Sequence, residues 1–196
     1  MRITAGELRG RSVTCPSGPQ VRPTSAKVRQ AFFNILGDRL RHSRFLDLFA
    51  GSGLMGFEAL SRGAGHVTFV DKDRSCASAI KQSARQFKLE ADSYEIISAD
   101  FEKALSFFSR QGTSFDIIFV DPPYKLHLGG KIVQIVQTGR LLSNRGLLVV
   151  EHLPNELLDK IEVESYPQDS KLVPIDQRRY GSTSLTIFAN ALTVEE

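Results

Sequence analysis

Short apolar runs alternate with helix-forming segments from residue 45 onward, and this rhythm constrains the fold more than any other feature. The runs have the length of buried strands and lie at residues 45–50, 66–70, 94–98, 115–120 and 146–151. Helical periodicity is present between them, at residues 54–62, 74–88, 101–111 and 129–142. Strands that alternate with helices require right-handed crossovers and a mostly parallel sheet with helices on both faces. The sequence therefore predicts a Rossmann-like α/β fold.

The two ends of the chain depart from this rhythm. Strand-like patterns at residues 161–166, 171–178 and 182–189 have no long helix between the last two, so we expect an antiparallel C-terminal hairpin completing a seven-stranded sheet. At the other end, residues 2–14 resemble two short strands joined through Gly6 and Gly10, followed by a helix capped by Thr24 or Ser25. We therefore predict an N-terminal extension over residues 1–44 and a catalytic domain over residues 45–196.

Positive charge is concentrated in the predicted extension. Residues 1–44 carry nine Lys and Arg against two acids, a net charge of +7, whereas the whole chain carries +3, so the remainder carries −4. One face of the predicted helix holds Lys27 and Arg29, which could present charge to a polyanion. Charge alone leaves two interpretations open, a solvated basic surface and a surface that binds phosphate groups.

Composition excludes several classes of protein. The amino terminus lacks the apolar core of a secretory signal, and no apolar run is long enough to span a bilayer, so we expect a cytoplasmic protein. Cys15 and Cys76 lie far apart, which indicates reduced thiols rather than a disulfide framework. The histidines show no ligand spacing, so we expect no metal; they are His42, His66, His127 and His152.

A glycine-rich loop follows the first apolar run. Gly51, Gly53 and Gly56 match the Gly-x-Gly-x-x-Gly pattern between a strand and a helix, which is the context of a nucleotide-binding turn. Asp71 comes twenty residues after Gly51, at the end of the next strand, where its carboxylate could accept hydrogen bonds from both ribose hydroxyls. Together these features predict a cofactor that contains adenosine.

Asp47 distinguishes between cofactors, because it interrupts the apolar strand before the loop. A carboxylate there suits the cationic methionine end of S-adenosylmethionine and is an awkward neighbour for a pyrophosphate. Asp100 follows the third strand and could bind the adenine amino group, cap the next helix, or do both. The expected cofactor-binding residues are Asp47, Phe49, Ala50, Gly51, Gly53, Asp71, Lys72, Asp100, Phe101 and Asp121.

The tetrapeptide Asp121-Pro122-Pro123-Tyr124 follows the apolar run at residues 115–120. Its prolines lock the backbone, so the Asp121 carboxylate and the Pro122 carbonyl can accept both hydrogens of an exocyclic amine and direct its lone pair at a methyl sulfonium. Tyr124 offers a flat face on which an extruded base could stack. We predict direct methyl transfer to a base, with Asp121, Pro122 and Tyr124 as the catalytic residues.

Several segments together are typical of one known family: residues 1–11, Arg22-Pro23-Thr24, residues 28–36, residues 47–53, the tetrapeptide and Arg179-Tyr180-Gly181 before the last strand. Through them the chain resembles the RsmD family of bacterial methyltransferases along its whole length. The resemblance implies methylation of guanine N2 in 16S ribosomal RNA, with Arg9, Arg11 and Arg22 of the basic arm facing the RNA. We expect Thr24, Lys27 and Arg29 to join this RNA-binding surface. Gln30 departs from the family, where an acid is expected, which leaves its local role open.

Other activities remain compatible with these motifs. An adenine-N6 methyltransferase of RNA or DNA would hold its amine with the same tetrapeptide, although no segment remains for a large domain that reads DNA. A glutamine-N5 protein methyltransferase would begin the tetrapeptide with Asn. A catalytically silent ribosome-assembly factor would have no chemical need for the acids at 47, 71 and 121. We expect a monomer that acts on ribosomal RNA, within a 30S particle or an assembly intermediate.

Overall fold

The computed structural model describes residues 1–16, 25–156, 158 and 171–191. They divide into two compact units, Met1–Phe101 and Glu102–Glu196. The division does not coincide with the predicted extension at residues 1–44, and that domain boundary stays a prediction. The strand predicted at residues 161–166 lies outside the described residues.

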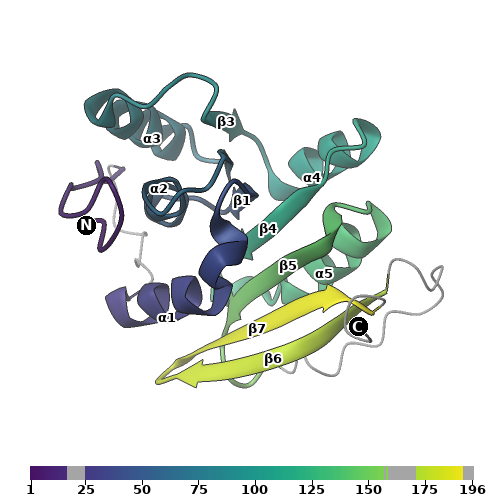
Figure 1. Ribbon diagram of the computed structural model, residues 1–196. Helices are drawn as coiled ribbons and strands as arrows, with labels where there is room; N and C mark the ends of the chain where they lie inside the picture. Colours follow the sequence, from purple (N-terminus) through teal and green to yellow (C-terminus); the bar gives the residue numbers. More distant parts are fainter. Residues whose placement is uncertain (17–24, 157, 159–170, 192–196) are drawn as a thin grey trace. The chain divides into compact units, whose positions relative to one another are not determined.

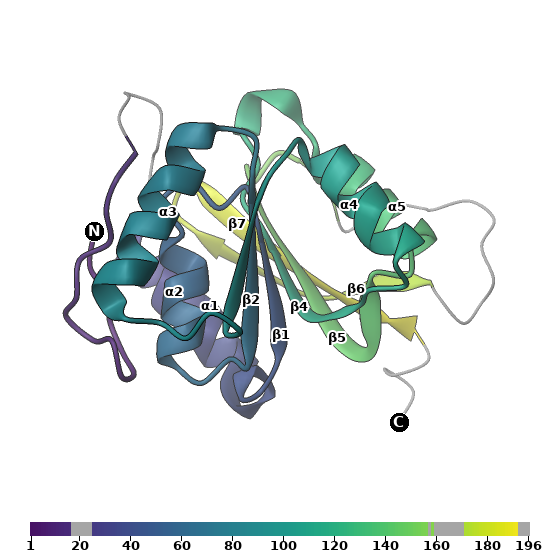
Figure 2. The same cartoon turned by 90° about the horizontal axis from the view of Figure 1, so that it is seen from above.

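Three parallel strands form the sheet of the first unit, in the order β3 (Tyr94–Ser98), β2 (His66–Asp71), β1 (Arg44–Leu48). Every residue of β1 after Arg44 is buried, as expected for a parallel strand covered by helices. Helices α1 (Ala26–Leu36), α2 (Leu54–Ser61) and α3 (Arg74–Phe87) lie together on one side of β1 and β2 (Figure 2). The short 3-10 helix η1 (Gly37–Leu40) joins α1 to the segment before β1.

The second unit combines one parallel and two antiparallel strand pairings. Strand β4 (Phe115–Val120) pairs in parallel with β5 (Leu142–His152), and β5 pairs antiparallel with β7 (Thr183–Asn190). Strand β6 (Leu172–Tyr180) completes the antiparallel hairpin with β7, and Figure 1 shows this hairpin beside β5. Helices α4 (Phe101–Arg110) and α5 (Gly129–Thr138) lie on one side of β4 and β5, and η2 (Tyr124–Leu126) follows β4.

These seven strands, mostly parallel with an antiparallel C-terminal hairpin, confirm the predicted Rossmann-like α/β fold. The predicted boundary between the helix at 129–142 and its following strand was wrong. The helix ends at Thr138, and Arg140 adopts a positive φ of 51°, which a continuing helix cannot accommodate. Strand β5 already begins at Leu142, because Leu142 pairs with Phe115 ahead of a shift in the register between the two strands.

The N-terminal arm, residues 1–14, forms a hairpin-like turn with a single antiparallel bridge between Arg2 and Ser12, rather than the two strands expected. Gly6 has a φ of +78°, and a Cβ atom on it would lie 1.7 Å from the Ser61 carbonyl oxygen. Only glycine therefore allows the arm to approach α2 this closely. The Glu7 amide donates to that same carbonyl at 2.8 Å, which fastens the arm to the end of α2.

Candidate functional site

The loop between β1 and α2 has the backbone conformation that its glycines predict. Gly51 and Gly53 have φ angles of 54° and 74°, in the left-handed region that glycine adopts at no steric cost. Phe49 also lies in this region, at φ 69°, so the chain turns sharply as it leaves β1. Gly56 lies against the sheet, since a Cβ atom there would be 2.2 Å from a ring carbon of Phe69. The loop therefore brings the start of α2 close to β2.

Asp71 ends β2, as predicted, and its carboxylate joins two segments of backbone. Oδ2 accepts from the Gly51 amide at 2.8 Å, and Oδ1 accepts from the Asp73 amide at 2.9 Å. The side chain is half-buried, so it keeps a face toward solvent while it holds the glycine loop. An acid placed here can also receive hydroxyl hydrogens from a ribose, which is the role that the sequence predicts for it.

Asp47 is buried beneath the loop, with 2 % of its surface exposed. Its Oδ2 accepts from the Gly56 amide at 2.9 Å, at the start of α2. Burial, opposed by this hydrogen bond and reinforced by the charge of Asp71, raises the pKa of Asp47 to about 7. No Lys or Arg of the described residues pairs with Asp47. Asp47 and Asp71, which have no ion pair with a described Lys or Arg, suit a ligand that carries both a positive charge and hydroxyl groups.

Two aromatic rings of the first unit lie against each other after β1 and β3. The centroids of Phe49 and Phe101 are 5.3 Å apart, with ring planes tilted by 40°. Asp100 is half-buried directly before α4, and Lys72 is exposed directly after β2. The Ala99 amide donates to the Asp71 carbonyl at 3.1 Å, which ties the end of β3 to the end of β2. All the expected cofactor residues except Asp121 thus lie in the first unit, near the carboxyl ends of its strands. Their roles in cofactor binding remain predictions.

The tetrapeptide Asp121-Pro122-Pro123-Tyr124 follows β4 and belongs to the second unit. Pro122 is buried, Pro123 is exposed, and Asp121 and Tyr124 are half-buried. The Pro123 carbonyl accepts from the Leu126 amide at 3.0 Å and closes η2. The loop therefore combines a fixed backbone with a partly accessible carboxylate and aromatic ring.

Tyr124 is held by one residue from β5 and one from β7, neither of which is among the residues predicted for the site. Its hydroxyl donates to Oε1 of Glu151 on β5 at 2.8 Å, and it lies 3.5 Å from the hydroxyl of Thr183 on β7. Burial and the negative charges of Asp121 and Glu151 raise the pKa of Tyr124, so the phenol stays protonated and can donate. The only sequence signal for Glu151 was an acid at the end of an apolar strand.

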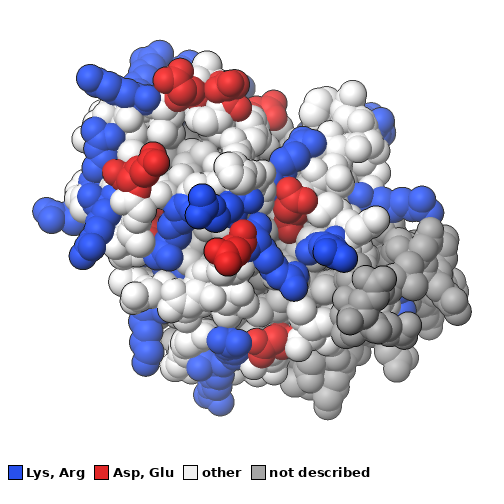
Figure 3. All heavy atoms as spheres, in the orientation of Figure 1, with Lys and Arg blue, Asp and Glu red and all other residues white. Residues whose placement is uncertain are grey.

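The residues predicted to bind RNA are partly exposed. Arg9, Arg11 and Lys27 are exposed, while Arg22 and Thr24 lie outside the described residues. Arg11 donates to the Phe87 carbonyl at 3.1 Å, and its guanidinium lies 5.3 Å from the centre of the Phe87 ring. In Figure 3, basic side chains gather along the left side of the face, over the N-terminal segment, α1 and α3. The RNA-binding surface remains a prediction, and the exposed side chains of Arg9, Arg11 and Lys27 could contribute to it.

Arg29 does not join that surface, contrary to the prediction, because it is buried, with 4 % of its surface exposed. Its Nε donates to Oε2 of Glu58 at 3.2 Å, and its terminal nitrogen donates to the Arg2 carbonyl at 3.1 Å. Burial opposes ionisation of Glu58, but hydrogen bonds from Thr4 and Arg62 hold the pKa of Glu58 below its usual value. Arg29 therefore fastens the N-terminal arm and α1 to α2, and is inaccessible to a phosphate.

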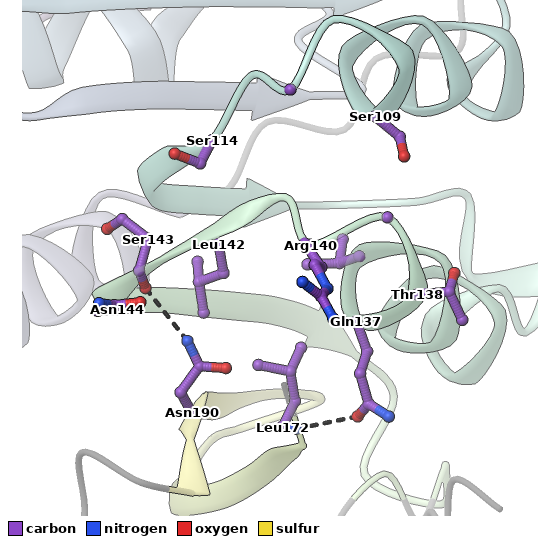
Figure 4. A pocket seen from close by; sticks show the side chains of 13 residues that line it. Ser109, Ser114, Gln137, Thr138, Arg140, Leu142, Ser143, Asn144, Leu172 and Asn190 are labelled. Carbon is purple, nitrogen blue, oxygen red and sulfur yellow. Dashed lines mark hydrogen bonds between the residues drawn. The ribbon is translucent and has the colours of Figure 1, made fainter. Parts of the chain in front are cut away.

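A cavity of about 760 Å³ lies in the second unit, around the beginnings of β4 and β5 (Figure 4). Its lining includes Ser114, Gln137, Arg140, Leu142 and Asn190, and none of the residues assigned to the cofactor or the base. Gln137 accepts from the Leu172 amide at 2.9 Å, and its buried Nε2 has no partner among the described residues. The tetrapeptide instead follows the opposite end of β4.

Neither a metal site nor a membrane span is found in the described part of the chain. No three His, Cys, Asp or Glu side chains within it are grouped as metal ligands would be. No helix within it is long and apolar enough to cross a membrane.

Residues 1–189 match a protein family described as "Conserved hypothetical protein 95". Its curated relatives include the Escherichia coli protein "Ribosomal RNA small subunit methyltransferase D", which is 34 % identical over 77 % of this chain and 74 % of that protein. The chain belongs to the RsmD family. The Bacillus subtilis relative YlbH, provisionally named an rRNA methyltransferase, is 35 % identical to this RsmD-family chain over 96 % of it and 98 % of YlbH.

Solved structures show the same fold as this RsmD-family protein. The Escherichia coli protein yhhF, provisionally described as a methyltransferase, superimposes with a TM-score of 0.78 at 28 % identity, covering 97 % of each chain. The Thermus thermophilus protein TTHA0928 gives a TM-score of 0.76 at 29 % identity, covering 95 % of this chain and 98 % of its own. A Streptococcus mutans protein crystallised with S-adenosylhomocysteine gives 0.63 at 17 % identity, covering 80 % of this chain and 48 % of its own, which shows the fold alone.

Proposed function

We propose that this protein transfers a methyl group from S-adenosylmethionine to N2 of a guanine in bacterial small-subunit (16S) ribosomal RNA. The observation that carries the proposal is the family membership, with a relative named as a small-subunit ribosomal RNA methyltransferase that is 34 % identical over 77 % of the chain. The tetrapeptide after β4 supports the type of acceptor, an exocyclic amine. We further propose that the protein acts as a monomer in the cytoplasm, on RNA within a 30S particle or an assembly intermediate.

The cofactor site proposed here consists of the acids and the glycine loop of the first unit. Asp71 would accept the ribose hydroxyls, while its bonds to the Gly51 and Asp73 amides hold the loop in place. Asp47, buried and without a cationic partner in the part of the chain that the structure describes, would face the positive charge of the methionine portion. When bound, S-adenosylmethionine supplies the methyl group as an electrophilic carbon on a sulfonium. The two acids and the glycine loop therefore fit S-adenosylmethionine.

The acceptor chemistry is assigned to the tetrapeptide of the second unit. The amino group of a purine is a poor nucleophile, because its lone pair is delocalised into the ring. The Asp121 carboxylate and the Pro122 carbonyl would accept its two hydrogens, which favours a pyramidal nitrogen and frees the lone pair for attack. The proton released after transfer can pass to the Asp121 carboxylate. Tyr124, fixed by Glu151 at 2.8 Å, would stack on the flipped base.

The decisive experiment measures transfer of labelled methyl from S-adenosylmethionine to three substrates in parallel: unmodified small ribosomal subunits, protein-free ribosomal RNA and duplex DNA. Nucleoside analysis of the product should yield N2-methylguanine from ribosomal RNA. A preference for particles over free RNA would support the proposed assembled substrate. The Asp121→Ala variant serves as the control for contaminating activity.

Two results would overturn the proposal. Label recovered as N6-methyladenine, or label in DNA, would leave the proposed cofactor unchanged and would show that the proposed substrate is wrong. Binding of S-adenosylmethionine without transfer to any of the three substrates would instead support a silent RNA-binding assembly factor.

A further inference from the structure

The turn between β6 and β7 lies next to the tetrapeptide loop within the second unit. Thr183, the first residue of β7, has its hydroxyl 3.5 Å from that of Tyr124. The turn itself consists of Gly181, at φ 63°, and Ser182, and both are exposed. Figure 1 shows the β6–β7 hairpin running beside β5, which supplies Glu151. The hairpin tip therefore borders the position where the target base would stack.

Register assigns the side chains near this tip to the two faces of the sheet. Residues directly opposite in an antiparallel pair share a face, and successive residues alternate. Glu151 is opposite Leu185, and Leu185 is opposite Arg178. Tyr180 is opposite Thr183, two residues from Leu185 on the same strand. Arg178 and Tyr180 therefore lie on the face that holds Glu151, Thr183 and the Tyr124 hydroxyl.

Hydrogen bonds on the other face of the sheet confirm this assignment of side chains to faces. Gln177 donates to the Thr186 hydroxyl at 3.1 Å, and His152 contacts the same hydroxyl at 2.7 Å. These residues alternate with those of the Tyr124 face, as the register requires. Arg179 is opposite Ser184 and belongs to this second face, where its Nε donates to the Gly181 carbonyl at 3.2 Å. Neighbouring arginines of one strand thus point to opposite faces.

The chemistry on the Tyr124 face suits a nucleic acid. Tyr180 is half-buried, so part of its ring is accessible, and Arg178 is exposed. The Arg178 side chain, 49 % exposed, pairs with Asp176 at 2.8 Å, a surface ion pair that contributes little stability. A phosphate can therefore replace Asp176 at small cost and accept hydrogen bonds from the guanidinium.

We propose that Arg178 and Tyr180 bind the RNA nucleotide adjacent to the methylated base, with the guanidinium on its phosphate and the phenol ring stacked on its base. The inference rests on the proposed function, since it supplies the neighbour of the base stacked on Tyr124. A half-exposed arginine beside an aromatic ring is the combination that binds single-stranded RNA. This contact would hold the strand on one side of the flipped nucleotide.

The test compares three single variants with the wild-type protein: Tyr180→Ala, Arg178→Gln and Arg179→Gln. Binding to unmodified small subunits is measured over a range of salt concentrations, together with methyl transfer at saturating cofactor and cofactor affinity in the absence of RNA. We expect Tyr180→Ala to weaken RNA binding about tenfold, the loss of one stacked base. Arg178→Gln should weaken binding and lower the slope of log K against log salt by about one. Arg179→Gln, the matched control on the other face, should change neither.

Further controls separate the possible outcomes. Tyr180→Phe retains the ring and should bind RNA like the wild type, which distinguishes stacking from a folding defect, and thermal unfolding verifies each variant. If the wild-type protein methylates ribosomal RNA, two results would overturn the inference. One is an equal effect of Arg178→Gln and Arg179→Gln on RNA binding, and the other is normal RNA binding by Tyr180→Ala. Loss of binding to particles with normal binding to protein-free RNA would assign the hairpin to a ribosomal protein and would also overturn it. If the wild-type protein itself methylates no ribosomal RNA, the proposed function has failed instead.

Discussion

The phenol hydroxyl of Tyr124 donates a hydrogen bond of 2.8 Å to Oε1 of Glu151, an acid with only 3 % of its surface exposed. The two residues are 27 positions apart in the sequence, on the loop after β4 and at the carboxyl end of β5. A buried carboxylate that accepts from a phenol fixes the ring in one orientation. Glu151 is therefore a positioning residue for the surface on which we propose that the base stacks.

Replacement of Glu151 should lower methyl transfer through the orientation of Tyr124. Glu151→Leu removes the acceptor, and a hydrogen bond to a charged group contributes about 1.5 to 3 kcal/mol, so kcat should fall at least about tenfold. Glu151→Gln retains an acceptor oxygen and should recover most of that loss. Steady-state kinetics on small subunits, with the KM for the cofactor as a reference, measures both. Equal losses in the two variants would show that the hydrogen bond does not position the ring.

Asp121 should affect the chemical step more than the folding of the protein. Asp121→Ala removes a proposed acceptor for the amine hydrogens, and loss of one such preorganised group lowers kcat by about 10² to 10³. Single-turnover transfer from pre-bound cofactor measures this step, and thermal unfolding provides the control for structure. Near-normal turnover by the variant would exclude the proposed direct role of this carboxylate.

Asp47 should make cofactor affinity depend on pH around neutrality. Its pKa of about 7 in the cofactor-free protein means that a cationic ligand must bind a carboxyl group that is mostly protonated at pH 6. If the ligand holds Asp47 ionised, binding releases a proton and affinity rises by about tenfold between pH 6 and pH 8. Calorimetric titration in buffers of different ionisation enthalpy reports both the affinity and the released proton. Asp47→Asn, which can still accept from the Gly56 amide, should abolish this pH dependence.

The same group predicts how stability changes with pH. Because the folded pKa of about 7 lies above the usual value of 3.8 for an aspartate, the folded state holds an extra proton between these values. The contribution of Asp47 to the free energy of unfolding therefore decreases as pH rises through this window. Denaturant unfolding of the cofactor-free protein at several pH values should show a smaller decrease in Asp47→Asn. An identical pH profile in the two proteins would contradict the raised pKa.

Substitutions of Arg29 and Lys27, both on α1, should have different effects: the first should lower stability, and the second should weaken the salt dependence of RNA binding. Arg29→Met leaves the buried Glu58 with fewer partners and should lower the free energy of unfolding by about 2 kcal/mol or more. Lys27 is exposed, so Lys27→Met should change stability by less than about 0.5 kcal/mol. Only Lys27→Met should reduce the salt dependence of RNA binding, by a slope of about one. A reduced slope with unchanged stability in Arg29→Met would contradict its structural role.

Much of the fold could be predicted because strand length and helical periodicity are local properties of the sequence. Strand β2 ends at Asp71 and α3 begins at Arg74, as expected. The start of β5 was missed, because residues 143–145 read as a polar connection although Leu142 already pairs with Phe115. Pairing between strands depends on a partner far away in the chain, which periodicity does not reveal.

The sequence by itself determined the local features of this protein: the left-handed glycine loop after β1, the acid at the end of β2 and the rigid tetrapeptide after β4. Each of these depends on residues that are close together in the chain. The tertiary structure decided which distant groups become partners, such as Arg29 with Glu58 and Tyr124 with Glu151. The physical reason is burial: a charged or aromatic side chain has the same local sequence whether it faces solvent or a buried partner, and only packing decides between them.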